Sequence, residues 1–560
     1  MSHDLVISAG TIVDGSGSER FKADIAIDSG RIVEIGQNLG KSKRTIDAEG
    51  KIVTPGFVDI HTHLDAQIAW DPIASSSCFH GVTSVVLGNC GVTFAPCKPE
   101  DRDYLAQLME SVEDIPADSI HAGLPWNWET YGEYLEAIDA MDKGVNVGGM
   151  VGHCAVRYHA MGERSLDEAP ATEDDLRKIT ALVDEAIGNG ALGFSTSRTF
   201  MHRVPDGRYV PGTHADAREM FAIGAVMGRH KKGVFEAAAR LGERDAEDLP
   251  NTRAEIAWMG EVSRNNDLNL TFGLVHSFRR PELYKRVIEF VEEENALGAR
   301  LRPQTTSRGV GGLFALDHRT PFDGSTSWKM LKDKSLSERL AMLEDETIRN
   351  SLCDLDVEPQ LDFKISYLLF DGAVDYQHDD ENSLASHAKR MNLSPVEAFV
   401  QLNRQHNGRV VIYHPGLNQS MEAIEEMLVN PTVAMGLADS GAHVGQIMDA
   451  SSPTWLLSYW VRDRGILSLE EAIRGWTSDT ANLFGINDRG LLREGCFADV
   501  NIIDLENLSI NLPEYKHDFP GGAGRYVQTG EGYDYVLVNG EVFMENGQHA
   551  GALSGQVLRS

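Results

Sequence analysis

The stretch from residue 145 to residue 197 decides the fold class. It holds the apolar run VNVGGMVGHCAVR (145–157), the charged, helix-like segment EDDLRKITALVDEAIGNG (173–190) and a second apolar run, ALGFSTS (191–197). Apolar runs that alternate with helical segments are typical of parallel β-sheets, whose strands are joined by crossover helices. The same order recurs in KGVFEAAARL (232–241) before TRAEIAWMGEVSRNN (252–266), and in LNLTFGLVHS (268–277) before PELYKRVIEFVEEENALG (281–298).

Further apolar runs follow the same texture, in RLRPQTT (300–306), GRVVIYHPG (408–416) and VAMGLADSGAH (433–443). About eight strand–helix units in one direction predict a (β/α)8 barrel of the TIM type. An open, doubly wound sheet is the alternative, but no GxGxxG sequence follows any of these strands. The stretch at about 307–405 is too long for a single connection, so we expect an inserted helical lid there.

Both ends of the chain have a different pattern. Segments such as ADIAIDSGRIVEIG (23–36) and YDYVLVNGEVFMENG (533–547) alternate with the period of β-strands and are separated by glycine-containing turns. We therefore expect residues 1–55 and 488–560 to meet in one small β-sandwich domain, with the barrel at 56–487.

Composition excludes several classes of protein. The 560 residues are 42% hydrophobic and 24% charged, with a formal net charge of −33, so neither nucleic acid nor an anionic membrane surface is an expected partner. Six scattered cysteines form no disulfide framework, and the first residues lack the pattern of a signal peptide. We expect a cytoplasmic protein that acts on a small molecule. Dimers or higher oligomers are expected only by analogy.

Three motifs carry candidate chemistry. PGFVDIHTHLDAQ (55–67) ends an apolar strand with His61 and His63, whose side chains share one face at this spacing and suit a divalent cation such as zinc. SVVLGNCGVT (84–93) presents Cys90 at the end of another apolar run; it could be a soft metal ligand or a buried apolar side chain. TVAMGLADSGAHVG (432–445) presents Asp439, which could bind metal and accept a proton from water, or begin a turn. His443 could orient Asp439, hydrogen-bond substrate or cap the turn.

The motifs PGFVDIHTHLD, GNCGVT, GHCAVR and GLADSGAH, with the tail TSDTANLFGINDRGLLREGCFADVNIID, resemble the amidohydrolase superfamily and, within it, the D-aminoacylase (N-acyl-D-amino-acid deacylase) family. The resemblance implies a barrel enzyme with one or two zinc ions. It implies that His61 and His63 hold one metal, that Cys90 replaces the carbamylated lysine of other branches, and that Asp439 shuttles the proton. His276 would be the sixth-strand ligand. The fifth strand lacks the expected histidine, and Glu236 is the nearest potential replacement.

An N-acyl amino acid carries a carboxylate, which an arginine side chain recognises well. The candidates are Arg198, then Arg157, then Arg302, and each could equally form a structural ion pair. His153 could support the metal site or simply pack at a strand end. The leading hypothesis is a metal-dependent hydrolase of N-acyl amino acids, with the D series preferred, or of related N-acyl amines. A cyclic amidase of the hydantoinase or dihydropyrimidinase type and a non-catalytic metal-binding relative are the alternatives.

Overall fold

The computed structural model describes residues 2–372 and 374–560 of the chain. Eight parallel strands form one sheet in the order β16-β12-β11-β10-β9-β8-β7-β6. A parallel bridge between Thr62, just after β6, and Ser440, just after β16, joins the two edges of this sheet, so it closes into the expected (β/α)8 barrel. The barrel strands are β6 (Phe57–Asp59), β7 (Val82–Leu87), β8 (Asn146–Gly152), β9 (Gly193–Ser197), β10 (Val234–Ala238), β11 (Asn269–Gly273), β12 (Leu301–Thr305) and β16 (Ala434–Met435).

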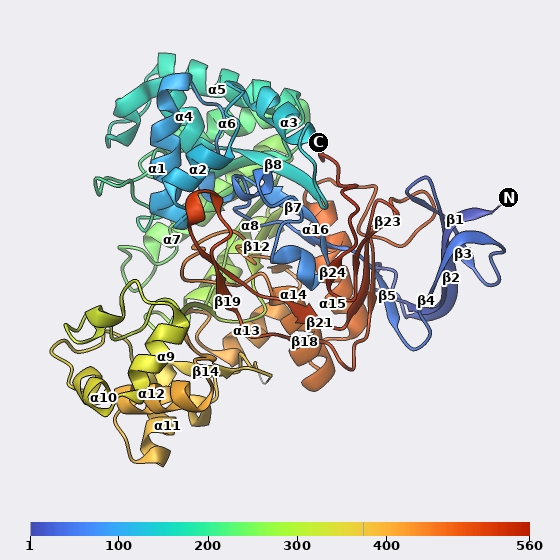
Figure 1. The fold of residues 1–560 in the computed structure, drawn as a ribbon. Helices are drawn as coiled ribbons and strands as arrows, with labels where there is room; N and C mark the ends of the chain where they lie inside the picture. The colour runs from blue at the N-terminus through green and yellow to red at the C-terminus, as the bar shows by residue number, and fades with distance from the viewer. Residues whose placement is uncertain (1, 373) are drawn as a thin grey trace.

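Helices cover the outside of the barrel, and α5 to α8 pack against one another in sequence (Figure 1). The segment that the sequence predicts as the helix at 173–190 is α5, which begins after a capping box formed by Thr172 and Asp175. None of the helices in the described part of the chain is long and apolar enough to cross a membrane. The helices of this layer are α1 (Arg102–Glu113), α2 (Ala117–Gly123), α3 (Tyr131–Asp139), α4 (His153–Met161), α5 (Glu173–Gly188), α6 (Ala217–His230), α7 (Pro250–Asn266), α8 (Leu283–Ala296), α13 (Met421–Leu428), α14 (Ser452–Trp455), α15 (Leu469–Trp476) and α16 (Ser478–Leu483).

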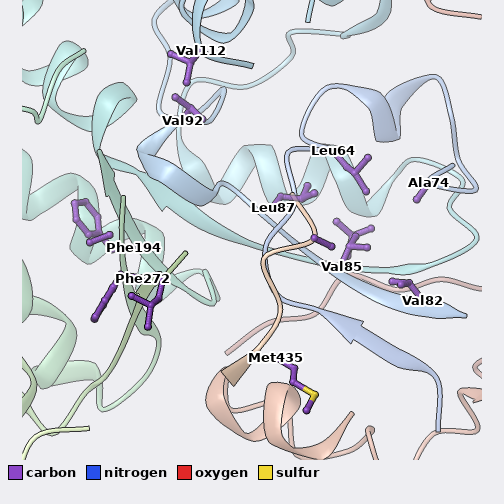
Figure 2. Packing of buried hydrophobic residues seen from close by; sticks show 14 of the residues in the cluster. Leu64, Ala74, Val82, Val85, Leu87, Val92, Val112, Phe194, Phe272 and Met435 are labelled. Atoms are coloured by element: carbon purple, nitrogen blue, oxygen red, sulfur yellow. The ribbon is translucent and has the colours of Figure 1, made fainter. Parts of the chain in front are cut away.

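Side chains alternate between the inside and the outside of the barrel. Those that face the helices join the largest hydrophobic core, from which Figure 2 shows Val85 of β7, Phe194 of β9 and Phe272 of β11. A separate apolar cluster fills one end of the barrel interior; its members are Val58, Ile60, Val86, Met150, Leu192, Val234 and Ala434, together with Ala481, Leu483, Phe484, Ile486 and Leu558. This apolar plug leaves the carboxyl ends of the strands as the open end, where barrel enzymes carry their sites.

Strands from both ends of the chain form one nine-stranded sheet beside the barrel (Figure 1). Strand β5 pairs with β1 on one side and with β17, from the carboxyl-terminal part, on the other. The buried side chains of this sheet, such as Ile25, Val53 and Leu537, form a core of their own. The strands are β1 (His3–Ile12), β2 (Phe21–Asp28), β3 (Arg31–Gly36), β4 (Ser42–Asp47), β5 (Ile52–Pro55), β17 (Val500–Ile503), β22 (Tyr533–Val538), β23 (Glu541–Glu545) and β24 (Gln548–His549); two short pairs, β18 (Ser509–Ile510) with β21 (Gly530–Glu531) and β19 (Glu514–Lys516) with β20 (Arg525–Val527), lie outside it.

The structure corrects one strand of the predicted barrel. GRVVIYHPG forms β15 (Val410–Leu417), which pairs antiparallel with β13 (Val310–Ala315) and β14 (Tyr367–Phe370) in a separate three-stranded sheet. Helices α9 (Leu336–Glu344), α10 (Glu346–Cys353), α11 (Leu384–Met391) and α12 (Pro395–Gln405) pack beside this sheet (Figure 1). Residues such as Phe322, Trp328 and Phe399 give this part a core distinct from that of the barrel.

Candidate metal centre

His61 and His63 extend β6 at the open end of the barrel, and both side chains are buried. The backbone N–H of His63 donates to the carbonyl of Ser440 at 2.7 Å, and the carboxylate of Asp59 accepts from the backbone N–H of His61 at 3.2 Å. The first bond ties the histidine pair to the turn after the last barrel strand, and the second fixes its backbone to β6. The ring centroids of the two imidazoles lie 5.6 Å apart, so both rings face the same space.

The GNCG turn brings Cys90 to the same space from the end of β7. Cys90 has φ = 54°, a left-handed conformation that is uncommon outside glycine. Gly91 lies so close to β9 that a Cβ atom there would be 2.6 Å from the backbone nitrogen of Ser197. As a result, the Sγ atom of Cys90 lies 3.5 Å from Nε2 of His61. Ligand atoms of His61, His63 and Cys90 all lie within 4.8 Å of one another.

Asp439 completes this group from the turn after β16. Its Oδ1 atom lies 3.1 Å from Nε2 of His63 and 3.6 Å from Nε2 of His61. Asp439 and His443 both have positive φ values, 53° and 47°, so the DSGAH turn holds these two residues in sparsely populated backbone conformations. The structure therefore brings together four side chains that lie far apart in the sequence.

Burial and charge give the four groups different protonation behaviour. Burial lowers the pKa of His61 to about 4, which favours the neutral, metal-binding form of the imidazole. Burial alone would also lower the pKa of His63, but the carboxylates of Glu113 and Asp439 outweigh it and raise this pKa to about 10. Burial opposes the charge on Asp439 as well, yet the hydrogen bond and charge of His63 hold its pKa well below the ordinary value. Burial raises the pKa of the Cys90 thiol, so a thiolate there needs a cation beside it.

Glu236, on β10, is the fifth group at this end of the barrel. It is fully buried, and its Oε2 atom accepts the backbone N–H of Cys90 at 3.0 Å. Its Oε1 atom has no hydrogen-bond partner among the described residues. Burial raises the pKa of this carboxyl to about 8. A buried carboxylate oxygen without a partner is costly, and a cation would satisfy it.

A pocket of about 480 Å³ opens onto His61, Cys90, Glu236 and Asp439. Its wall is mainly apolar, and the polar groups gather at the barrel end and at the rim. Beyond the four residues above, the wall includes Met201, Leu241, Leu274, Val275, Leu283, Val310, Leu417 and Leu437, with His202, Glu243, Arg279 and Arg280 among the polar residues. An apolar pocket with a few convergent polar groups is the common form of a small-molecule site.

His276 does not join the metal group. It lies three residues beyond the end of β11, and its backbone N–H donates to the side chain of Asn418 at 2.8 Å. Its ring packs against Phe278 at 5.3 Å and Tyr284 at 6.0 Å between centroids. The strand alternation that directs side chains inward no longer applies at this position, because the chain has left the sheet.

The predicted carboxylate-binding arginines also lie elsewhere. Arg157 is fully buried and donates to Glu219 at 3.1 Å and to the carbonyl of Ser165. Arg198 is 6% exposed and donates to Glu255 at 3.2 Å. Both arginines form internal ion pairs. Among the described residues, the lining of the pocket includes neither of them, and it does not include Arg302.

The two remaining predicted histidines have separate surroundings. His153 is fully buried and bridges Thr196 at 2.8 Å and the same Glu219 at 2.7 Å, so it belongs to the ion pair of Arg157 rather than to the metal group. His443 is 36% exposed, and its Nε2 atom lies 4.0 Å from the carboxylate of Glu113. It is near Asp439 in the chain but does not line the pocket.

Three residues near the site were not predicted from the sequence. Glu113, at the end of α1, is buried and lies 3.4 Å from Nδ1 of His63. His202 and Arg279 line the pocket from the loops that follow β9 and β11. Loops after barrel strands carry function in this fold, so both loop residues had a weak signal in their position, whereas Glu113 had none.

Comparisons with known proteins identify the family to which the chain belongs. The profile of the amidohydrolase family matches residues 44–544. A D-aminoacylase of Alcaligenes xylosoxydans is 30% identical over 98% of this chain and 96% of its own, and an uncharacterised protein of Mycobacterium bovis is 27% identical over 98% and 93%. The solved structure of an N-acyl-D-glutamate deacylase from Bordetella bronchiseptica, complexed with zinc and a phosphonate inhibitor, matches all of both chains with a TM-score of 0.64 at 21% identity, which supports the fold. The chain therefore belongs to the amidohydrolase family, and within it is similar to the D-aminoacylases.

Proposed function

We propose that this amidohydrolase uses zinc to cleave the amide bond of N-acyl-D-amino acids. The observation that carries the proposal is the convergence of His61, His63 and Cys90, whose ligand atoms lie within 4.8 Å of one another beside Asp439. Nitrogen and sulfur donors at this separation fit one zinc ion. A second ion would need a further ligand, for which the unpartnered oxygen of Glu236 is the candidate.

A zinc ion held there would supply Lewis-acid activation of the amide carbonyl and would lower the pKa of water. The chain's own residues would do the rest. Asp439, ionised because its pKa is held low, accepts a proton from the attacking water and passes it to the nitrogen of the departing amine. The apolar wall of the pocket excludes water from the acyl group and the amino-acid side chain.

The D-amino-acid preference and the acyl substrate class rest on similarity to the D-aminoacylases, combined with the size and apolar wall of the pocket. Arg279 is exposed at the rim and is our candidate for the substrate carboxylate, in place of Arg198 and Arg157. An arginine at the rim can bind a carboxylate while the acyl group reaches the metal centre.

A substrate panel tests the proposal. Metal-stripped protein, with and without added zinc, is assayed on N-acetyl-D- and N-acetyl-L-amino acids, hydantoin and dihydrouracil. We expect zinc-dependent release of free D-amino acid, at a rate lowered by orders of magnitude in the Asp439→Asn variant. Hydrolysis of the cyclic amides alone would reject the acyl substrate class, and activity that is independent of added metal would reject the zinc site.

A further inference from the structure

Among the described residues, two imidazoles line the pocket, those of His61 and His202. His61 is a predicted metal ligand, whereas His202 has no predicted role. It lies on the loop between β9 and α6 and is half-buried. The pocket that it lines also contains His61, Cys90 and Asp439. A group in this position can contact a molecule bound against the metal centre.

The loop that carries His202 is held in place at several points. The carboxylate of Glu243 accepts the backbone N–H of Phe200 at 2.6 Å and also the hydroxyl of Thr199. Arg240 donates to the carbonyl of Arg198 at 2.6 Å. These contacts hold residues 198–200, and the hydrogen bond of His202 to Ser197 holds the ring itself, so the imidazole is positioned for an electrostatic contact in a transition state.

The hydrogen bond between His202 and Ser197 fixes the proton on the imidazole. Oγ of Ser197 lies 2.8 Å from Nδ1 of His202, and it has no other partner among the described residues. Ser197 is fully buried, so its hydroxyl proton needs an acceptor, and Nδ1 is the acceptor at hand. Nδ1 is then unprotonated, and Nε2 carries the N–H of the neutral ring. Burial lowers the pKa of His202 to about 4, in agreement with a neutral ring.

We propose that the Nε2–H of His202 donates a hydrogen bond to the carbonyl oxygen of the scissile amide as this oxygen becomes negatively charged. This role rests on the proposed hydrolysis. In that step the water oxygen bonds to the carbonyl carbon, the C=O electron pair moves onto the oxygen, and Asp439 takes the water proton. The C–N bond then breaks, and the amine nitrogen receives that proton. His202 gives up no proton; it stabilises the charge.

Two substitutions separate this role from a structural one. His202→Phe keeps a ring of similar size but removes the donor, whereas His202→Gln places an amide N–H near the position of Nε2. We expect His202→Phe to lower kcat by about 10²- to 10³-fold with little change in KM, the range measured when one oxyanion donor is removed. His202→Gln should recover part of this loss. His214→Phe, on the same loop but outside the pocket wall, is the matched control and should behave like the wild type.

Two readouts do not depend on turnover. Nitrogen-15 spectra of histidine-labelled protein should show Nε2–H for His202, and Ser197→Ala should weaken this preference. Methylphosphonate, a small tetrahedral anion, should bind zinc-loaded His202→Phe at least tenfold more weakly than wild type, with an unchanged zinc content in both. If the wild type cleaves no amide in the panel, the proposed function fails, and these two readouts still decide the role of His202.

Three results would overturn the inference. Loss of zinc in His202→Phe would make His202 a metal ligand. An Nδ1–H tautomer would leave Nε2 without the proton that it is proposed to donate. Equal methylphosphonate affinity and equal kcat in wild type and His202→Phe would show that the ring contributes only to the shape of the wall.

Discussion

Replacing Glu113 with glutamine should weaken zinc binding without unfolding the barrel. Glu113 is 2% exposed at the end of α1, and its Oε1 atom lies 3.4 Å from Nδ1 of His63. The other ring nitrogen of His63 faces Cys90, His61 and Asp439. A carboxylate behind a metal-binding imidazole orients the ring and makes its free nitrogen a stronger ligand. Glutamine keeps the shape and an acceptor oxygen but removes the charge.

The expected size of the effect follows from this geometry. Two full unit charges 3.4 Å apart interact by about 5 kcal/mol at an effective dielectric constant of about 20. A neutral imidazole bound to a cation carries only part of a unit charge, so a fraction of this energy applies. Removal of such a partner weakens metal binding by about 10- to 100-fold, or about 1.4–2.7 kcal/mol. We expect Glu113→Gln within this range and Glu113→Ala at or beyond its upper end.

The assay is competition for zinc between the protein and a chromogenic chelator, with thermal unfolding of the metal-free proteins as a measure of folding. Glu110→Gln, on the same helix and exposed, is the matched control and should leave zinc affinity unchanged. If Glu113→Gln binds zinc as tightly as the wild type while Cys90→Ser does not, the carboxylate does not support His63 and the reasoning is refuted. If metal-free Glu113→Gln unfolds, the buried charge serves the packing of α1 instead.

Asp439→Asn should retain zinc and lose turnover by about 10²- to 10⁴-fold, because a general base is missing; metal analysis beside kinetics checks this, and unchanged turnover would reject the shuttle. Gly91→Ala should lower zinc content, since a Cβ atom would approach the backbone nitrogen of Ser197 to 2.6 Å; normal zinc content in a folded variant would contradict this. Burial raises the pKa of Asp175, but Arg164 and Thr172 outweigh it and lower this pKa to about 2. Because the pKa of Asp175 is lower in the folded than in the unfolded protein, its charge stabilises the fold by about 2 kcal/mol above pH 5, and this stabilisation is lost as the pH falls toward 2. Asp175→Asn should therefore lower the unfolding temperature at pH 7 and less at pH 3.5, and a difference independent of pH would exclude the charge as the cause.

The sequence pattern was sufficient to predict the barrel, because the alternation of strands and helices can be recognised from local composition. It could not assign β15 to a sheet, since a short apolar run has the same appearance in any buried strand. It singled out His61, His63, Cys90 and Asp439 because each belongs to a short motif within a few residues of the carboxyl end of a barrel strand.

Side chains further from the strand ends were beyond such reasoning. His276 lies three residues past its strand, as Cys90 does, but its backbone is hydrogen-bonded to Asn418, a contact that no local pattern indicates. Arg157 has a buried acidic partner 62 residues away in the chain, and no local pattern indicates such pairing. Glu113 reaches His63 from the last residue of α1, and the position of His202 depends on the path of a loop. The assignments of these side chains to roles remain predictions.

The bridge between Thr62 and Ser440 is the only join between the first and last strands of the barrel among the described bridges. It lies at the level of the metal centre, with His61 and His63 on one side and Asp439 on the other. A cation bound to these residues would hold the first and last strands of the barrel together. Release of the metal should then weaken this junction, so that the backbone amides near Thr62 and Ser440 exchange with deuterated solvent before those of the other barrel strands. Binding of a cation there would therefore stabilise the closed barrel as well as supply the chemistry of the site.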